Sequence, residues 1–132
     1  PTIMIYGHYD VQPADPLELW HTAPFEPDIR GGRIYARGAS DVKGSTTVAI
    51  ETIGRFLAVE GGCPVNVKLF LEGEEEVGSP SLPALIETHR DLLAADAMLS
   101  ADGGGAAGAV PVLNIGCRGI CALQFSLRTA RK

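Results

Sequence analysis

The stretch "TIMIYGHYD", residues 2–10, decides the fold of this chain. Residues 2–7 form an apolar run of strand length that ends at Gly7, and such a run predicts a strand that is buried on both faces. Strands of this kind belong to parallel sheets that helices cover. His8 and Asp10 follow directly, so polar side chains stand where the strand ends. The stretch therefore predicts an α/β sheet with a functional edge.

Strand and helix patterns alternate along the rest of the chain. A helix is predicted over 43–60, because apolar residues recur there at helical spacing and a Gly-Gly pair follows. A second helix is predicted over 79–94. Further strands are predicted over 32–38, 65–73, 96–102, 110–116 and 120–129. This order predicts a three-layer α/β/α sandwich with a mixed, mostly parallel sheet, and the mixed strands come towards the end.

The composition limits the classes of function. The 132 residues are 45% hydrophobic and 20% charged, which predicts one globular domain with a core of its own. A net charge of −5 with eleven scattered Lys and Arg residues argues against a nucleic-acid partner. No segment reads as a membrane span or a signal peptide, so we expect a soluble protein without a membrane partner.

The cysteines and the two ends of the chain give two further expectations. Cys63, Cys117 and Cys121 lack the CxxC spacing and cannot all pair, which favours a reducing compartment and so the cytoplasm. Cys117 and Cys121 are expected to be small buried residues. Because the chain starts inside a strand pattern without methionine and stops at the close of another, we expect it to be part of a larger protein.

Polar residues collect after the predicted strands. His8 and Asp10 follow the first strand, residues 74–76 follow the strand at 65–73, and Asp102 ends the strand at 96–102. Asp41 lies in the loop before the long helix. In open α/β sheets ligands bind at the carboxyl ends of strands, so four loops can bring a histidine and several carboxylates to one edge.

An imidazole among carboxylates suits zinc or manganese. The His-x-Asp spacing lets Asp10 accept the far ring N–H of His8, which would fix the tautomer of this ligand. His21 and His89 lack comparable neighbours and are expected to be structural. The long proline-rich segment between residues 10 and 32 is expected to be an irregular, functional loop.

The run "LFLEGEEEVGS", residues 69–79, places four carboxylates in five positions. A run of this kind is usually a solvated acidic turn. If some of the carboxylates are partly buried, they must shift their pKa values, pair with a cation or bind a metal. The sequence alone leaves both interpretations open at this point.

The segment "DGGGAAG" places Gly103, Gly105 and Gly108 in a GxGxxG pattern after a strand. A dinucleotide site would need a helix next, whereas the following residues are strand-like and include Pro111. We therefore expect a glycine-rich turn rather than a nucleotide site.

Four motifs in order resemble a known family. "YGHYDVQP", "GRIYARGASDVKG", "LEGEEEVGS" and "SADGG" are similar to the co-catalytic metallopeptidases, di-zinc or di-manganese enzymes. This family includes aminoacylase, carboxypeptidase G, succinyl-diaminopimelate desuccinylase and the carnosine-type dipeptidases. The "VQP…LWHTAPFEP" segment and "EGEEEVGS" resemble the dipeptidase branch most. The resemblance implies a zinc-exopeptidase-like fold, of which residues 1–132 are part of the catalytic domain.

The resemblance also implies roles for particular residues. His8, Asp41 and Asp102 would bind one metal ion, and Asp41 would bridge to a second ion that Glu76 holds. Glu75 would be the general base that deprotonates the water. Asp10, the expected partner of the His8 ring, is counted with Glu75 among the catalytic residues. A cis peptide bond is implied between Asp41 and Val42. The two divalent ions, zinc or manganese, would serve hydrolysis of the amide bond of dipeptides or N-acyl amino acids.

Two features implied by the resemblance are missing from the chain. The family closes its second metal site with a distal histidine and carries a lid domain that dimerises; no histidine follows His89, and no room for that domain remains. We therefore expect a truncated catalytic domain that is inactive by itself, from a parent that forms homodimers. The alternative is a non-catalytic metal-binding or structural module derived from such an enzyme.

Overall fold

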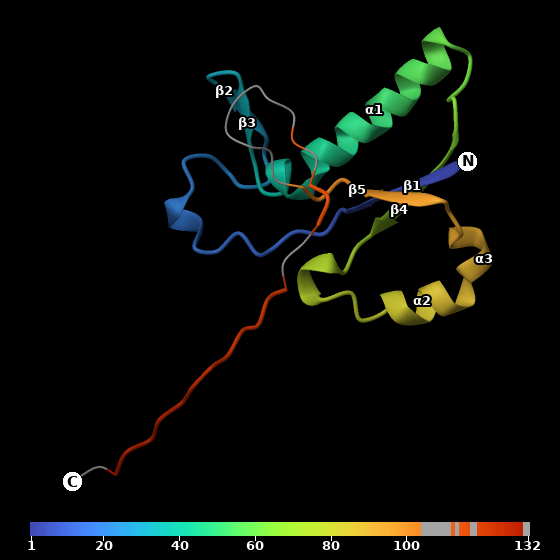
Figure 1. Cartoon of the computed structure of the whole chain (residues 1–132). Coiled ribbons are helices and arrows are strands. Elements are labelled where there is room, and N and C mark those ends of the chain that lie inside the picture. Colours follow the sequence, from blue (N-terminus) through green and yellow to red (C-terminus); the bar gives the residue numbers. More distant parts are fainter. Residues whose placement is uncertain (104–111, 113, 117–118, 131–132) are drawn as a thin grey trace.

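Three parallel strands form the main sheet of the computed structural model, which describes residues 1–103, 112, 114–116 and 119–130. Strand β1 (Thr2–His8) lies in the centre, between β4 (Asn66–Glu72) and β5 (Ala97–Ser100) (Figure 1). All three were expected from their apolar patterns. The order β4-β1-β5 places strands that are far apart in sequence side by side, which requires crossover connections.

The register brings the carboxyl ends of these strands to one edge. His8 lies opposite Glu72 of β4, and Tyr6 lies opposite Ser100 of β5. The ladder continues past the strand ends, since Tyr9 N–H donates to Glu72 O at 2.9 Å and Ala101 N–H donates to Tyr6 O at 2.8 Å. Residues that follow the three strands therefore emerge together.

Helices cover both faces of this sheet. Helix α1 (Gly44–Val59) lies on one face, and α2 (Leu82–Thr88) with α3 (Arg90–Leu93) lies on the other (Figure 1). The predicted three-layer α/β/α sandwich with a mostly parallel sheet is confirmed. The helix predicted over 79–94 is divided at His89, whose φ of −119° and ψ of 26° are not helical.

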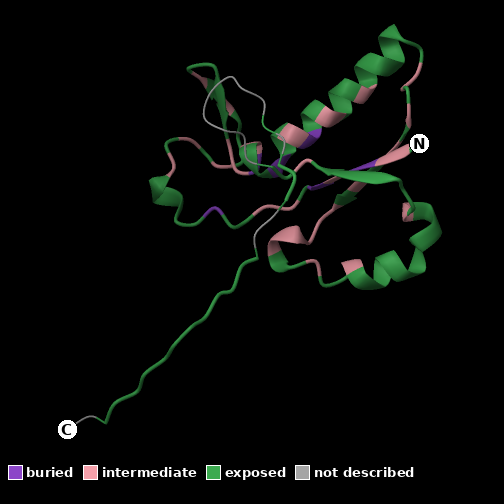
Figure 2. Cartoon of the chain, in the orientation of Figure 1, coloured by how far each residue is buried: buried purple, intermediate pink, exposed green. Residues whose placement is uncertain are grey.

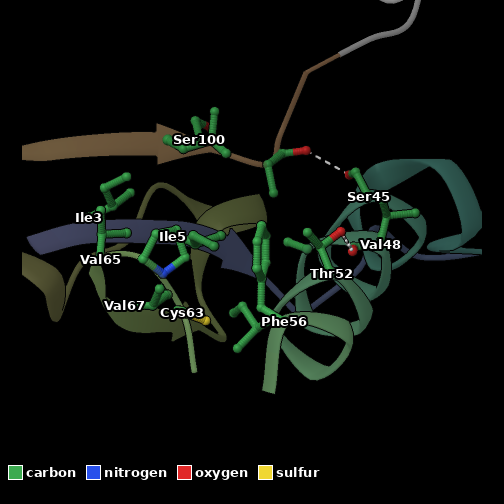
Figure 3. A pocket seen from close by; sticks show the side chains of 15 residues that line it. Ile3, Ile5, Ser45, Val48, Thr52, Phe56, Cys63, Val65, Val67 and Ser100 are labelled. Carbon is green, nitrogen blue, oxygen red and sulfur yellow. Dashed lines mark hydrogen bonds between the residues drawn. The ribbon is translucent and has the colours of Figure 1, made fainter. Parts of the chain in front are cut away.

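Gly7 allows α1 to approach the centre of the sheet. A Cβ atom at this position would lie only 2.6 Å from Thr46 Oγ1, closer than any ordinary contact. Thr46 lies in the first turn of α1 and is itself buried. The apolar side of α1 then faces the sheet, where Val48, Ile53 and Phe56 line a cavity of about 580 Å³ with residues of β1 and β4 (Figure 3).

A second, two-stranded sheet lies inside the long connection. Strand β2 (Asp28–Arg30) pairs antiparallel with β3 (Arg33–Tyr35), and neither joins the main sheet. The prediction missed β2 and treated residues 10–31 as irregular. Gly31 and Gly32 connect the strands with φ of 56° and 72°, and two adjacent residues with positive φ make the tight turn that suits a hairpin.

The prediction of a strand over 120–129 is wrong for this structure. Residues 119–130 form no regular element and extend away from the sheet (Figure 1), and Ile120 and Phe125 are almost fully exposed. A strand needs a neighbour for its backbone hydrogen bonds, and none of the described strands lies beside this segment. Cys121 is exposed for the same reason, contrary to the expected burial.

The structure covers only part of the strand predicted over 110–116 and of the glycine-rich segment before it. Of the strand predicted over 110–116, the described residues 112 and 114–116 form no strand, and the remainder lies outside the described residues. The mixed part of the sheet is accordingly not formed in the described part of the chain. Cys117, Gly105 and Gly108 also lie outside it.

The core is small and lies next to the edge at which the strands end. Most of the chain in Figure 2 is coloured as exposed, and the buried residues are concentrated along β1 and in the turn before α1. Among the described residues, the buried apolar side chains are Met4, Ile5, Ala14 and Val42, and the buried polar ones are His8 and Thr46. None of the helices in the described residues is long and apolar enough to cross a membrane.

Replacement of Ile5 by alanine tests the position of this core. Ile5 is 8% exposed, and its truncation should lower the free energy of unfolding by about 2–5 kcal/mol. Ile29, on β2, is 75% exposed and provides the same substitution as a control, with an expected change within about 0.5 kcal/mol. Urea unfolding of both variants measures the difference. Equal losses would contradict a core centred on β1.

Candidate metal and catalytic site

His8 lies at the centre of a group of carboxylates. It ends β1, its side chain is fully buried, and its Nε2 points to the edge of the sheet. Asp41 Oδ1 lies 3.1 Å from this nitrogen, and Asp102 Oδ2 lies 3.9 Å from it. The structure thus brings together three of the predicted metal ligands from three separate segments.

The geometry of these three residues suits a metal ion. One donor atom from each lies within 4.8 Å of the other two. Ligand atoms around a tetrahedral zinc ion are separated by about 3.4 Å, as bond lengths near 2.1 Å require. Asp41 is 63% exposed and Asp102 is 38% exposed, so the group opens to solvent on the side away from His8. A set of one imidazole and two carboxylates therefore fits zinc or manganese with an open position.

Asp10 holds the other nitrogen of the His8 ring. His8 Nδ1 lies 3.1 Å from the carbonyl oxygen of Asp10 and 3.3 Å from its carboxylate Oδ1. An N–H at Nδ1 facing these oxygens leaves Nε2 free to act as the ligand. The hydrogen bond of Nδ1 goes to the backbone carbonyl of Asp10, whereas the carboxylate Oδ1 lies within ion-pair distance but makes no hydrogen bond. Asp10 therefore faces the far ring nitrogen as predicted, but its backbone rather than its carboxylate is the acceptor.

Asp10 also connects His8 to the acidic run. Its Oδ2 accepts a hydrogen bond from the backbone N–H of Glu76 at 2.9 Å. Burial alone would raise the pKa of the Asp10 carboxyl, but backbone hydrogen bonds, the largest from Glu76, together with the charge of His8 give a net lowering. Asp10 therefore remains an ionised partner for His8.

The turn before α1 presents Asp41. Gly38 has a φ of 81°, and a Cβ there would lie 2.8 Å from Val11 Cγ1, so glycine is required where this turn begins. The backbone then leaves the helical region at Asp41 and Val42, and the peptide bond between them is cis, as the resemblance implies. Val42 is 1% exposed and anchors the turn beneath the site.

Glu75 faces the same group of side chains. Its Oε2 lies 3.8 Å from His8 Nε2, and the side chain is 37% exposed. Burial raises the pKa of Glu75 above its ordinary value, and the charges of Asp102, Glu76 and Asp41 add to this increase against the opposing effect of His8. A carboxylate with a raised pKa at an open metal-binding group is suited to accept a proton.

The neighbouring charges also act on His8. Burial lowers the pKa of this imidazole, while the hydrogen bond to Asp10 and the charges of Glu75 and Asp102 raise it, with a net increase. The excess of negative charge around one imidazole is what a bound cation would neutralise.

Glu76 points away from its neighbour Glu75. Its carboxylate accepts hydrogen bonds from the backbone N–H of Gln12 at 3.2 Å and from Gln12 Nε2 at 2.9 Å. The side chain of Glu76 is thus held beside the proline-rich loop and lies outside the three-residue group of possible ligands. Sequence reasoning did not single out Gln12, because an amide that orients a carboxylate has no spacing signal of its own.

The other two carboxylates of the run are structural. Glu72 Oε1 accepts the hydroxyl hydrogen bond of Tyr6 at 2.5 Å, and partial burial together with this bond raises the pKa of Tyr6. Glu74 accepts hydrogen bonds from the N–H and the hydroxyl of Ser81, immediately before α2. Within this acidic run, Glu72 and Glu74 therefore support the fold, Glu75 faces the candidate site, and Glu76 lies beside it.

The histidines that were expected to be structural lie apart from this group. His21 lines a different hollow beside the β2–β3 hairpin, and His89 lies between α2 and α3. Gly103 of the glycine-rich segment has no helix behind it within the described residues, so they give no support for a nucleotide site.

The sequence of this chain is similar to those of known peptidases. Residues 4–118 match the model of peptidase family M20/M25/M40. The chain is 39% identical over 130 residues to a cysteinylglycine-S-conjugate dipeptidase from Corynebacterium striatum, covering 98% of this chain and 28% of that protein. It is 37% identical over 123 residues to a beta-Ala-His dipeptidase from Rattus norvegicus, covering 92% of this chain and 25% of that one. The chain thus spans about a quarter of the length of these relatives.

Solved structures agree with this match. An M20 family metallo-carboxypeptidase from Sulfolobus solfataricus superposes with a TM-score of 0.75 and 47% identity, over 79% of this chain and 23% of that chain. Human carnosine dipeptidase 1 superposes with a TM-score of 0.71 and 39% identity, over 77% and 22%. The sequence match, the parallel sheet and the histidine with its carboxylates at the sheet edge agree: this chain belongs to peptidase family M20/M25/M40.

Proposed function

We propose that this chain supplies much of the active site of a metal-dependent hydrolase that cleaves the amide bond of dipeptides or N-acyl amino acids. The observation that carries the proposal is the convergence of His8 Nε2, Asp41 and Asp102, with Glu75 Oε2 at 3.8 Å from the same nitrogen. Relatives named as dipeptidases support the substrate class. Because the chain spans about a quarter of their length, the activity is proposed for the longer protein.

The proposed cofactors are two divalent ions, zinc or manganese. His8, Asp41 and Asp102 would hold one ion, and their donor atoms already lie together. Asp41 and Glu76 would hold the other, for which Glu76 must turn from Gln12. The ions would supply the polarisation of the scissile carbonyl and the lowered pKa of the attacking water.

The residues of this chain then have distinct tasks. Glu75 accepts a proton from water and later delivers it to the departing amine, for which its raised pKa suits it. Asp10 fixes the ring of His8 so that Nε2 faces the site. Amide hydrolysis is balanced by this transfer, since water provides both the hydroxyl of the new acid and a proton of the new amine.

The extent of the functional unit is also a proposal. We infer that residues 1–132 are part of a catalytic domain, that the remaining part and a lid domain belong to the longer protein, and that this protein is a homodimer. A cytoplasmic location and the lack of a nucleic-acid partner are proposed from the composition. Cys63 and Cys121 are free thiols, which is compatible with a reducing compartment.

The alternative is a metal-binding or structural module without turnover. The hydrogen bond between Glu76 and Gln12 favours this alternative for the isolated chain. Of the two proposed ligands of the second ion, Asp41 lies in the cluster, whereas Glu76 is held by Gln12. A peptidase assay of the longer protein separates the two functions.

Metal binding by the chain itself gives the first test of the site. We expect about one tightly bound zinc ion and no measurable dipeptidase activity, since about three protein ligands and a water make a stable open site. His8→Ala should abolish this binding, whereas His89→Ala, at a helix junction, should bind zinc like the original chain. Calorimetric titration with zinc measures both. Tight binding of two zinc ions per chain would refute the expectation that the two metal sites differ in affinity.

Substitution of Glu75 and substitution of Glu76 in the longer protein should have different effects on turnover and metal content. Glu75→Gln should retain both metal ions and lose about 10²–10⁴-fold in turnover, because only the base is removed. Glu76→Gln should lose part of its metal content first. Metal analysis and kcat on the same samples decide this, and equal loss of metal in both variants would disprove the assignment.

Asp10→Asn tests the orientation of His8. Removal of the carboxylate charge 3.3 Å from Nδ1 should lower zinc affinity by about 10–100-fold while the fold is kept. Asp91→Asn, in the first turn of α3, is the control and should not change zinc affinity. If Asp10→Asn binds zinc with the original affinity, the carboxylate does not orient the ligand.

A further inference from the structure

One hydroxyl group connects the two segments that carry the aspartates of the cluster. Ser45 Oγ, in the first turn of α1, donates a hydrogen bond to the carbonyl oxygen of Ala101 at 2.6 Å. The same Oγ lies 3.2 Å from the carbonyl oxygen of Val42. Val42 directly follows Asp41, and Ala101 directly precedes Asp102. Figure 3 shows the hydroxyl of Ser45 facing the end of β5.

The bond to Ala101 fixes the peptide group that leads into Asp102. The N–H of Ala101 already donates to Tyr6 O of β1, so this residue is held to the sheet. The carbonyl of the Ala101–Asp102 peptide accepts from Ser45, and its N–H donates to Ser100 Oγ at 3.3 Å. Both polar groups of one peptide are therefore held, and the direction in which Asp102 leaves β5 is set.

The surroundings make the Ser45 bond the stronger of the two. Ser45 is half-buried at the rim of the apolar cavity between α1 and the sheet, whereas the Ser100 contact is longer and exposed. A hydroxyl has a single proton, and the shorter distance assigns it to Ala101 rather than to Val42. Without this hydroxyl, the Ala101 carbonyl would lose its partner, and β5 would lose its link to the turn that presents Asp41.

We propose that Ser45 is a positioning residue that holds Asp41 and Asp102 at the separation at which they bind a metal ion with His8. The inference rests on the proposed metal site, and it adds a residue that makes no contact with the metal-binding atoms. Ser45 acts on Asp102 through its hydrogen bond to the Ala101 carbonyl, and on Asp41 through the chain, because it directly follows the turn that presents Asp41. Its loss should therefore change the metal affinity more than the stability of the fold.

Zinc affinity of four forms of the longer protein tests this role. By competition with a chromophoric chelator, Ser45→Ala should bind zinc about 10-fold more weakly. Ser45→Thr retains the hydroxyl, and its added methyl group has room in the cavity, so this variant should bind like the original protein. Thr47→Ala removes a hydroxyl of the same helix that bonds only Lys43 O, and it should not change the affinity. Original affinity in Ser45→Ala would overturn the inference.

A second substitution at Ser45 and the hydrogen exchange of the Asp102 amide test the same role independently. If Ser45→Ala does not fold, Ser45→Cys, whose thiol is a weaker donor than a hydroxyl, should bind zinc more weakly than Ser45→Thr, and equal affinity of these two variants would overturn the role. If the unaltered protein binds no zinc, the proposed metal site is wrong. Hydrogen exchange of the Asp102 amide in metal-free protein then decides the positioning: faster exchange in Ser45→Ala than in Thr47→Ala supports it, and equal rates refute it.

Discussion

Parallel pairing of β4 and β5 with β1 is the constraint on which the rest of this structure depends. Parallel strands of one sheet end at the same edge, and the loops that follow them must emerge together. His8 ends β1, Glu75 and Asp102 lie in the segments that follow β4 and β5, and Asp41 joins them from the turn before α1. A change of register in either pair would separate these residues even if each strand formed normally.

The edge of the sheet brings together charges that repel one another. Glu75, Asp41 and Asp102 all lie near one buried imidazole. Burial and the neighbouring carboxylates raise the pKa of Glu75; burial lowers the pKa of His8, but the hydrogen bond to Asp10 and the carboxylate charges outweigh it and raise this pKa. The protein does not neutralise this group with a lysine or arginine among the described residues, and the carboxylates remain open to solvent. The crowding is understandable if a divalent cation completes the arrangement, because its charge would favour the ionised carboxylates.

Hydrogen bonds and ion pairs from residues that are not proposed metal ligands set the geometry of the site. Asp10 orients His8 and accepts the N–H of Glu76, Gln12 holds the Glu76 carboxylate, and Ser45 joins the segments of Asp41 and Asp102. The contacts of Asp10 and Gln12 with Glu76, and that of Ser45 with Ala101, join segments that are far apart in the sequence. Orientation of ligands by such partners is a general requirement of metal sites, since loops alone do not hold side chains accurately.

The sequence by itself determined the parallel α/β layers, the long helix and the residue types of the site, because apolar periodicity and the position of polar residues after strands are local properties of the chain. It also predicted that His8, Asp41 and Asp102 meet. It did not predict the β2–β3 hairpin, the hold of Gln12 on Glu76 or the bond of Ser45 to Ala101. It wrongly predicted a strand over 120–129, since a strand forms only beside another strand. These features depend on which segments become neighbours in space, and only the tertiary structure decides that.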